Sequence, residues 1–117
     1  MPRPVVMRKG RAAPEKRLQW EIRRALETLG FDVTSTSQPQ RAMMTAGIPD
    51  LYARHPRWKL RLWIEVKTPR GRVRPAQAAW IEAERAAGGH AIVARSLGDV
   101  LDALRELGAP IETHTGR

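Results

Sequence analysis

Residues 47–67 read GIPDLYARHPRWKLRLWIEVK, and two carboxylates stand apart within this stretch. Asp50 and Glu65 are the only acidic residues between Asp32 and Glu82, in an interval that holds nine arginines and lysines. Two isolated acids in a basic segment serve either as salt-bridge partners or as metal ligands. The strand pattern around them favours metal ligands.

Aliphatic side chains stand at positions 62, 64 and 66, and Trp63, Glu65 and Lys67 alternate with them. This period of two predicts a strand with Glu65 and Lys67 on the same face. Asp50 opens a second short apolar run, Leu51–Ala53, which also reads as a strand. Two adjacent strands bring Asp50 and Glu65 within reach of one cation. Mg²⁺ is a hard ion that binds carboxylate, water and phosphate oxygens.

Composition limits the classes of protein to consider. A chain of 117 residues suits one domain with one core. With 42% apolar and 28% charged residues, it lies in the globular range. The absence of cysteine excludes a disulfide framework, a thiolate zinc site and a cysteine nucleophile.

The charge balance indicates a polyanionic partner. The net charge is +9 and the pI about 11.4, which suits a nucleic acid or an anionic membrane surface. Nucleic acid is favoured because the basic residues are spread along the chain. No apolar run approaches the roughly 18–20 residues of a membrane span. The basic N-terminus lacks the apolar core of a signal peptide, so we expect a cytoplasmic protein with no membrane partner.

Prolines and glycines mark the ends of three expected helices. The first runs from Pro14 to Leu29 before Gly30, and the second from Pro75 to Ala87 before a glycine pair. Ser96 is a credible N-cap for the third, which ends at Gly108. Four short segments read as strands: residues 31–35, 50–53, 62–67 and 90–95.

The resulting order, αβββαβα, predicts an α/β fold with a mixed sheet flanked by helices and a C-terminal helix. We expect one domain at residues 14–108, a basic flexible lead-in at 1–13 and a flexible tail at 109–117. Residues 54–61 should form a turn in which His55 either contacts phosphate or, as the pattern favours, is exposed. The second helix should pack through Ala76, Ala79, Trp80 and Ala83.

Two polar residues lie on helices near the expected site. Glu15 falls on the inward face of the first helix, in its first turn. It either interacts favourably with the helix dipole or approaches the metal, and the two roles are compatible. Gln77 lies in the first turn of the second helix, close in sequence to Lys67. It is either a solvated amide or a member of the site.

Asp50, Glu65 and Lys67 together suit phosphodiester hydrolysis, which needs a metal and positive charge near the reacting phosphate. Asp50 and Glu65 supply the metal seat, and the Val66 carbonyl can add a ligand. Lys67 orients or activates water, or stabilises developing charge. Glu15 reaches the metal directly or through water. The candidate phosphate contacts are Arg41, Lys59, Arg70, Arg72 and Arg74.

The alternative is structural, with Glu65 and Lys67 as an exposed pair on a strand and Asp50 capping a turn. Taken alone, Glu-x-Lys is a common pattern. Its combination with Pro49-Asp50 resembles the PD-(D/E)XK nuclease superfamily, whose core order is αβββαβ.

More narrowly, the chain resembles the VRR-NUC family over roughly residues 14–104. The matching segments are Glu15 to Gln19, Gly47 to Leu51, Ile64 to Lys67, Pro69 to Gly71, Gln77 with Trp80, and Gly88-Gly89. Two features depart from the family pattern. Arg74 stands where a Ser or Thr helix cap is usual, and residues 36–46 lack an Asn often found there.

The resemblance implies a Mg²⁺- or Mn²⁺-dependent DNA endonuclease with Glu15, Asp50, Glu65, Lys67 and Gln77 in the site. Stand-alone phage and bacterial members act as homodimers on branched DNA, including four-way (Holliday) junctions, whereas others are fused to larger repair proteins. We expect this chain to be of the stand-alone type. The competing functions are a non-catalytic DNA-binding module, and a nuclease that acts on RNA or within a restriction system.

Overall fold

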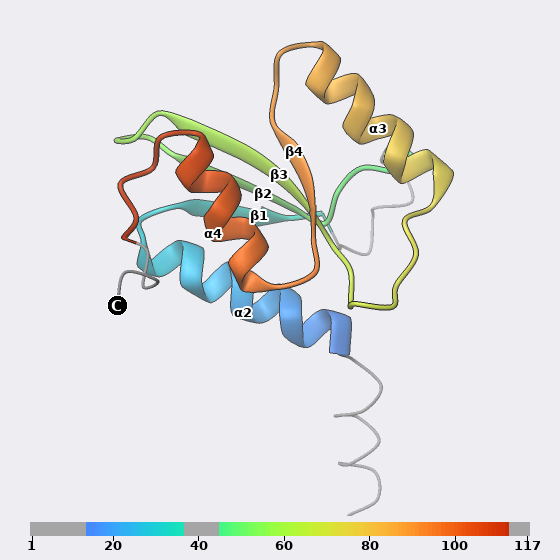
Figure 1. Ribbon diagram of the computed structural model, residues 1–117, viewed down its shortest axis with the longest axis horizontal. Coiled ribbons are helices and arrows are strands. Elements are labelled where there is room, and N and C mark those ends of the chain that lie inside the picture. The colour runs from blue at the N-terminus through green and yellow to red at the C-terminus, as the bar shows by residue number, and fades with distance from the viewer. Residues whose placement is uncertain (1–13, 37–44, 113–117) are drawn as a thin grey trace, which may run out of the picture.

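The computed structural model describes residues 14–36 and 45–112, and within them three helices flank the two faces of one four-stranded sheet (Figure 1). The strands are β1 (Asp32–Ser35), β2 (Leu51–His55), β3 (Leu60–Val66) and β4 (Ala91–Ala94). The helices are α2 (Pro14–Thr28), α3 (Pro75–Ala86) and α4 (Leu97–Glu106). The predicted lead-in at residues 1–13, residue 41 and the end of the tail lie outside the described residues.

The sheet has the order β1-β2-β3-β4. β1, β2 and β3 form an antiparallel meander, whereas β4 pairs parallel to β3. A parallel pair needs a crossover connection, and α3 supplies it. The predicted order αβββαβα and the α/β class with a mixed sheet are confirmed.

One face of the sheet carries the core. Leu51 and Ile64, which are cross-strand partners, are 1% and 0% exposed. α2 covers this face with Ile22 and Leu26, and α4 with Val100 and Leu104. α2 begins at Pro14, and α4 is capped by the Ser96 hydroxyl, which accepts a hydrogen bond from the Asp99 amide. These boundaries agree with the sequence prediction.

α3 lies apart from α2 and α4, on the side of the sheet opposite to them (Figure 1). Its one buried residue is Ile81, while Gln77 and Trp80 are half-buried. The prediction that Ala76, Ala79 and Ala83 face inward is wrong, because these three alanines are exposed. The helix packs on the sheet through Gln77, Trp80 and Ile81 instead.

The β2–β3 turn is shorter than predicted. Arg54 pairs with Arg61 and His55 with Leu60, so only residues 56–59 form the turn. His55 is 2% exposed, and its prediction as an exposed turn residue is wrong. Its Nδ1 accepts a hydrogen bond from the Trp58 amide at 3.0 Å, so its Nε2 carries the proton and donates to the Leu29 carbonyl at 2.9 Å.

Aromatic contacts complete the burial of His55. The ring stacks on Trp58 at 4.0 Å and meets the edge of Phe31 at 4.9 Å. Gly30, at φ +102, ends α2 directly beside it, and a Cβ there would lie 2.8 Å from His55 Nε2. Glycine is therefore needed at residue 30 for both backbone conformation and space.

Residues 109–112 belong to the folded unit, which extends beyond the predicted boundary at residue 108. Ala109 is 7% exposed and Ile111 packs against the core. Arg105 on α4 donates hydrogen bonds to the carbonyls of Ile111 and Glu112 at 3.3 and 3.1 Å. These contacts with α4 explain why the expected tail is ordered at its start.

Candidate active site

The site lies on the sheet face opposite to the core, where β3 ends. Alternation along β3 turns Leu62, Ile64 and Val66 toward the core and leaves Glu65 and Lys67 on the other face. Continuing the β2–β3 register by one residue beyond Leu51 and Ile64 sets Asp50 opposite Glu65. The strand assignment made from sequence therefore brings the two isolated acids together, as predicted.

Asp50 is held by main-chain hydrogen bonds. Its Oδ2 accepts a hydrogen bond from the Val66 amide at 2.9 Å. The Thr36 amide donates to the Asp50 carbonyl at 2.9 Å, and the Thr36 hydroxyl donates to the Pro49 carbonyl at 2.7 Å. Thr36 is buried and fixes the segment that enters β2. Its role is not visible in the sequence, because it lies in a polar loop with no distinctive spacing.

Gly47 brings this entering segment against the start of α3. Its φ of +85 suits glycine. A Cβ at residue 47 would collide with the carbonyl oxygen of Ala76. The close approach fixes the position of the first turn of α3 relative to Asp50, and Gln77 lies in that turn.

Glu65 is 1% exposed, and its two carboxylate oxygens differ in their contacts. Oε2 accepts a hydrogen bond from Gln77 Nε2 at 2.8 Å and lies 3.4 Å from Lys67 Nζ. Oε1 is buried and has no hydrogen-bond partner within residues 14–36 and 45–112. Such an orphaned acceptor is costly to bury, and a bound cation would satisfy it.

The surroundings of Glu65 raise its pKa from 4.5 to about 7. Burial is the main cause, followed by the negative charge of Asp50; Lys67 acts in the opposite direction, and Glu15 adds a small increase. A buried carboxylate whose ionisation is opposed by a neighbouring negative charge is a frequent property of metal and catalytic sites.

Gln77 joins the site through its position on α3. Its Oε1 accepts a hydrogen bond from the Arg74 amide at 2.9 Å, so the side chain caps the helix while Nε2 holds Glu65. Arg74 is the N-cap residue, where the family pattern suggests Ser or Thr. Gln77 supplies the side-chain capping bond from the third helical position instead.

Glu15 is half-buried in the first turn of α2, and its charge acts on Glu65. Nevertheless, among the residues described, no group of three or more acidic or histidine side chains could hold a metal ion. The structure thus pairs Asp50 with Glu65 and does not bring Glu15 into a cluster of three carboxylates.

The predicted phosphate contacts divide into two groups. Arg70, Arg72 and Arg74 lie on the segment that connects the end of β3, next to Glu65, with α3. Lys59 lies at the other end of β3, six residues before Glu65 and therefore roughly 20 Å away along the strand. Arg41 falls outside the described residues.

Arg95 is a second residue whose role the sequence does not predict. It follows β4 and lies beside Lys67 in the parallel register. Its Nη1 donates hydrogen bonds to the carbonyls of Thr68, Gly71 and Pro69 at 2.7, 2.8 and 3.3 Å. One guanidinium thus organises the segment that carries the three arginines.

The residues present fit a divalent cation. Asp50 and Glu65 offer hard oxygen donors on one face, and Glu65 Oε1 has no other partner in the described part of the chain. Mg²⁺ is often bound by one or two carboxylates together with waters and phosphate oxygens. The Val66 amide points toward Asp50, and its carbonyl points to the same side of β3 because both groups of a strand residue do.

Comparison with known proteins identifies a family. The sequence model described as "VRR-NUC domain" matches residues 15–97. A solved structure called "VRR_NUC domain" is 30% identical, with a TM-score of 0.64; the match covers 81% of this chain and 97% of the other. A second, "VRR_NUC domain protein", is 21% identical with a TM-score of 0.51 over 73% and 83% of the chains, and shows the fold alone. No curated protein matched the chain.

Proposed function

Because the chain belongs to the VRR-NUC domain family, which is a nuclease family, we propose that it is a metal-dependent DNA endonuclease selective for branched DNA. The buried carboxylate of Glu65 carries the proposal. Its Oε2 is held by Gln77 and Lys67. Its Oε1 has no hydrogen-bond partner in the described residues, and the negative charge of Asp50 acts on the same carboxylate.

In this proposal Asp50, Glu65 and the Val66 carbonyl hold Mg²⁺ or Mn²⁺, and Glu15 contributes through water. When bound, the cation polarises the scissile phosphate and makes water more acidic. Gln77 keeps Glu65 in one orientation by donating to Oε2. This hydrogen bond leaves Oε1 available to the cation.

Lys67 has two candidate roles at the same position. It is 7% exposed, and its ammonium lies 3.4 Å from Glu65. As a cation it stabilises negative charge on the phosphate during hydrolysis. In its neutral form it accepts a proton from the attacking water. Arg70, Arg72 and Arg74 bind flanking phosphates and position the strand without reading bases.

Holliday-junction resolution is the proposed reaction within this class, carried out by a homodimer in the cytoplasm. None of the three helices in residues 14–36 and 45–112 has the length and apolar content of a membrane span. In the described part of the structure, a single chain offers one such carboxylate pair, Asp50 and Glu65, and symmetric cleavage of a four-way junction needs two sites. The competing outcomes are a non-catalytic DNA-binding module, and a nuclease acting on RNA or within a restriction system.

The test is cleavage of a labelled four-way junction with Mg²⁺, with Mn²⁺ and with EDTA, beside a linear duplex and an RNA of the same sequence. Asp50→Ala and Asp50→Asn should lower the cleavage rate at least about 100-fold while DNA binding is kept or tightened, because a negative charge is removed. Asp50→Asn retains an oxygen acceptor for the Val66 amide, so it keeps the test valid if Asp50→Ala does not fold.

Asp32→Ala is the matched control. Asp32 is an exposed acid on β1 that lies 4.0 Å from Arg54, so this change removes the same charge outside the site. Equal cutting of junction and linear duplex would remove the branched-DNA proposal. Binding without cleavage under either metal would leave a DNA-binding module, and preferential cutting of RNA would change the substrate.

A further inference from the structure

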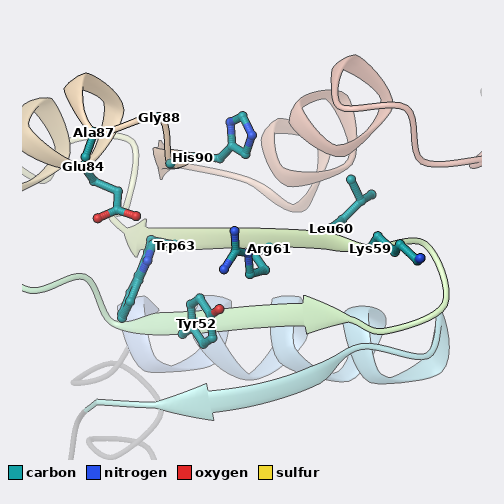
Figure 2. Close-up of a pocket in the computed structure, with 10 residues that line it drawn as sticks. Tyr52, Lys59, Leu60, Arg61, Trp63, Glu84, Ala87, Gly88 and His90 are labelled. Carbon is teal, nitrogen blue, oxygen red and sulfur yellow. The ribbon is translucent and has the colours of Figure 1, made fainter.

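A groove of about 440 Å³ lies over the first half of β3, next to the site but containing none of its carboxylates (Figure 2). It exists because β4 begins only at Ala91, opposite Trp63, so residues 60–62 of β3 pair with β2 alone. The segment after α3 forms the other wall. Among the residues that line the groove are Tyr52, Trp63, Lys59, Arg61 and Glu84.

Two aromatic side chains form one end of the groove. Tyr52 and Trp63 are cross-strand partners with ring centroids 4.4 Å apart, and both are half-buried. Trp80 of α3 closes the far side of Trp63 at 4.9 Å but does not line the groove. The pair therefore keeps accessible ring surface toward the groove, where a planar group can stack.

The groove also has unpaired positive charge. Lys59 and Arg61 are exposed, and within the described part of the chain neither side chain makes an ion pair or a hydrogen bond. Arg61 lies between the aromatic pair and Lys59 (Figure 2). Glu84 is the one carboxylate of the lining, so the two cations outweigh it and favour an anionic ligand.

The groove continues the line of the site. Trp63 precedes Glu65 by two residues on one face of β3, and Tyr52 follows Asp50 by two on β2. Two strand residues advance roughly 7 Å, which is about two steps of a stacked nucleotide strand at 3.4 Å each. A strand whose phosphate lies at the carboxylates thus reaches the aromatic pair with its next few nucleotides.

We propose that this groove binds unpaired nucleotides of the DNA substrate next to the cleavage site. Their bases stack on Tyr52 and Trp63, and their phosphates lie near Arg61 and Lys59. Bases inside a duplex cannot offer their faces to protein side chains, so the aromatic pair selects a single-stranded segment. This inference rests on the proposed nuclease function and names a substrate feature for it.

The experiment measures binding in EDTA, where no cleavage occurs, using a fluorescent oligothymidylate of twelve nucleotides and a duplex of the same length. Tyr52→Val should weaken single-strand binding by roughly 5- to 160-fold, the range for one stacked base. Tyr52→Phe should keep it. Trp20→Ala is the aromatic control, because Trp20 is 58% exposed on α2, across the sheet.

A second experiment tests the positive charge of the groove. It compares Arg61→Ala with Arg24→Ala on α2, a control that removes the same charge outside the groove. Arg61→Ala should reduce the salt slope of single-strand binding by about 0.7, the value for one lost phosphate contact. Arg24→Ala should leave that slope unchanged. An equal loss from both variants would show that only net charge matters, and would overturn the assignment of Arg61.

Lys59 allows a change that separates binding from packing. Its φ of 59 is in the left-handed region, which favours glycine. Lys59→Gly should therefore keep or raise the melting temperature while weakening single-strand binding about twofold or more. A lower melting temperature with unchanged binding would show a structural lysine and contradict the proposal.

The two proposals fail separately. If the wild-type protein cuts DNA and Tyr52→Val binds single strands as tightly as wild type, the aromatic pair only packs and this inference falls. The same conclusion follows if Tyr52→Val weakens duplex and single-strand binding equally. If the groove variants lose single-strand binding but wild type cuts nothing with either metal, the groove stands and the nuclease proposal falls.

Discussion

Glu65 is a carboxylate whose surroundings oppose its own charge. Burial and Asp50 raise its pKa to about 7, and Lys67 and Gln77 both contact the same oxygen, Oε2. Without a cation, the ionised form is therefore less favourable in the folded chain than in the unfolded chain. A divalent ion at the free oxygen would reverse this, so the residue couples metal binding to stability.

This gives a pH prediction for the metal-free protein. The folded pKa lies above the usual 4.5, so between the two values the folded chain retains a proton that the unfolded chain has released. Its stabilising effect is complete below about pH 4.5 and is lost as pH rises through 7. Relative to wild type, the free energy of unfolding of Glu65→Gln should therefore increase by roughly 3 kcal/mol between pH 4.5 and pH 8. Urea unfolding in EDTA at several pH values measures it.

Glu82→Gln, at an exposed position of α3, is the control and should follow wild type at every pH. Mg²⁺ should stabilise wild type above pH 7 and leave Glu65→Gln nearly unaffected. A constant stability difference between Glu65→Gln and wild type over the whole pH range would contradict the raised pKa.

At this scale the sequence identified residues that carry an unusual charge pattern. Asp50, Glu65 and Lys67 were found because isolated acids and strand alternation are visible in one dimension. Thr36 and Arg95 were not, because their roles consist of hydrogen bonds to carbonyls distant in sequence. Such contacts leave no local period or spacing.

The segment between β3 and α3 has no regular structure, and Arg95 organises it from outside. Its side chain donates to three carbonyls between Thr68 and Gly71, and its amide donates to Asp99 at 2.8 Å. The segment therefore depends on β4 and α4 for its shape. We infer that Arg95 is a positioning residue for Arg70, Arg72 and Arg74.

Arg95→Met should lower stability by about 1–3 kcal/mol, because hydrogen bonds from a charged donor are lost. It should also weaken DNA binding several-fold and raise KM more than it lowers kcat, since Asp50 and Glu65 are untouched. Thermal unfolding and steady-state cleavage measure the two effects. Loss of stability with unchanged KM would mean that the shape of the segment does not serve substrate binding.

The helix starts were predicted well, because proline or a capping serine marks each of them in the sequence. The contact face of α3 and the burial of His55 were not. Proline and serine starts fixed the beginnings of α2, α3 and α4. The contact face of α3 was wrong because alanines occur on several of its sides, and the helix packs over only part of the sheet. His55 was misjudged because its burial depends on Phe31 and Trp58, which meet it only in the folded chain.

For the whole molecule, the proposed homodimer follows from one carboxylate pair per chain and two cuts per junction. It predicts that wild type sediments as a dimer at concentrations where it cleaves. A mixed dimer of one wild-type and one Asp50→Ala chain, purified through two different tags, should nick a cruciform plasmid without linearising it. The measurement is the ratio of nicked to linear product.

Wild-type homodimers purified through the same two tags are the control and should give linear product. Linear product from the mixed dimer at the wild-type rate would show that one site makes both cuts. A monomer that cuts junctions symmetrically would also contradict the proposal. The architecture of one chain was predictable from its sequence, whereas its association was not, because no pattern in the sequence marks which surface another copy would cover.

The hydrogen bond from the Val66 amide to Asp50 makes one backbone group a natural spectroscopic label. The resonance frequency of an amide proton depends on the charge of its acceptor, and this acceptor is a candidate metal ligand. In a proton–nitrogen correlation spectrum, Mg²⁺ titration should shift the Val66 signal, and paramagnetic Mn²⁺ should broaden it. Occupancy of the cation site can thus be read without DNA, without cleavage and without altering a residue.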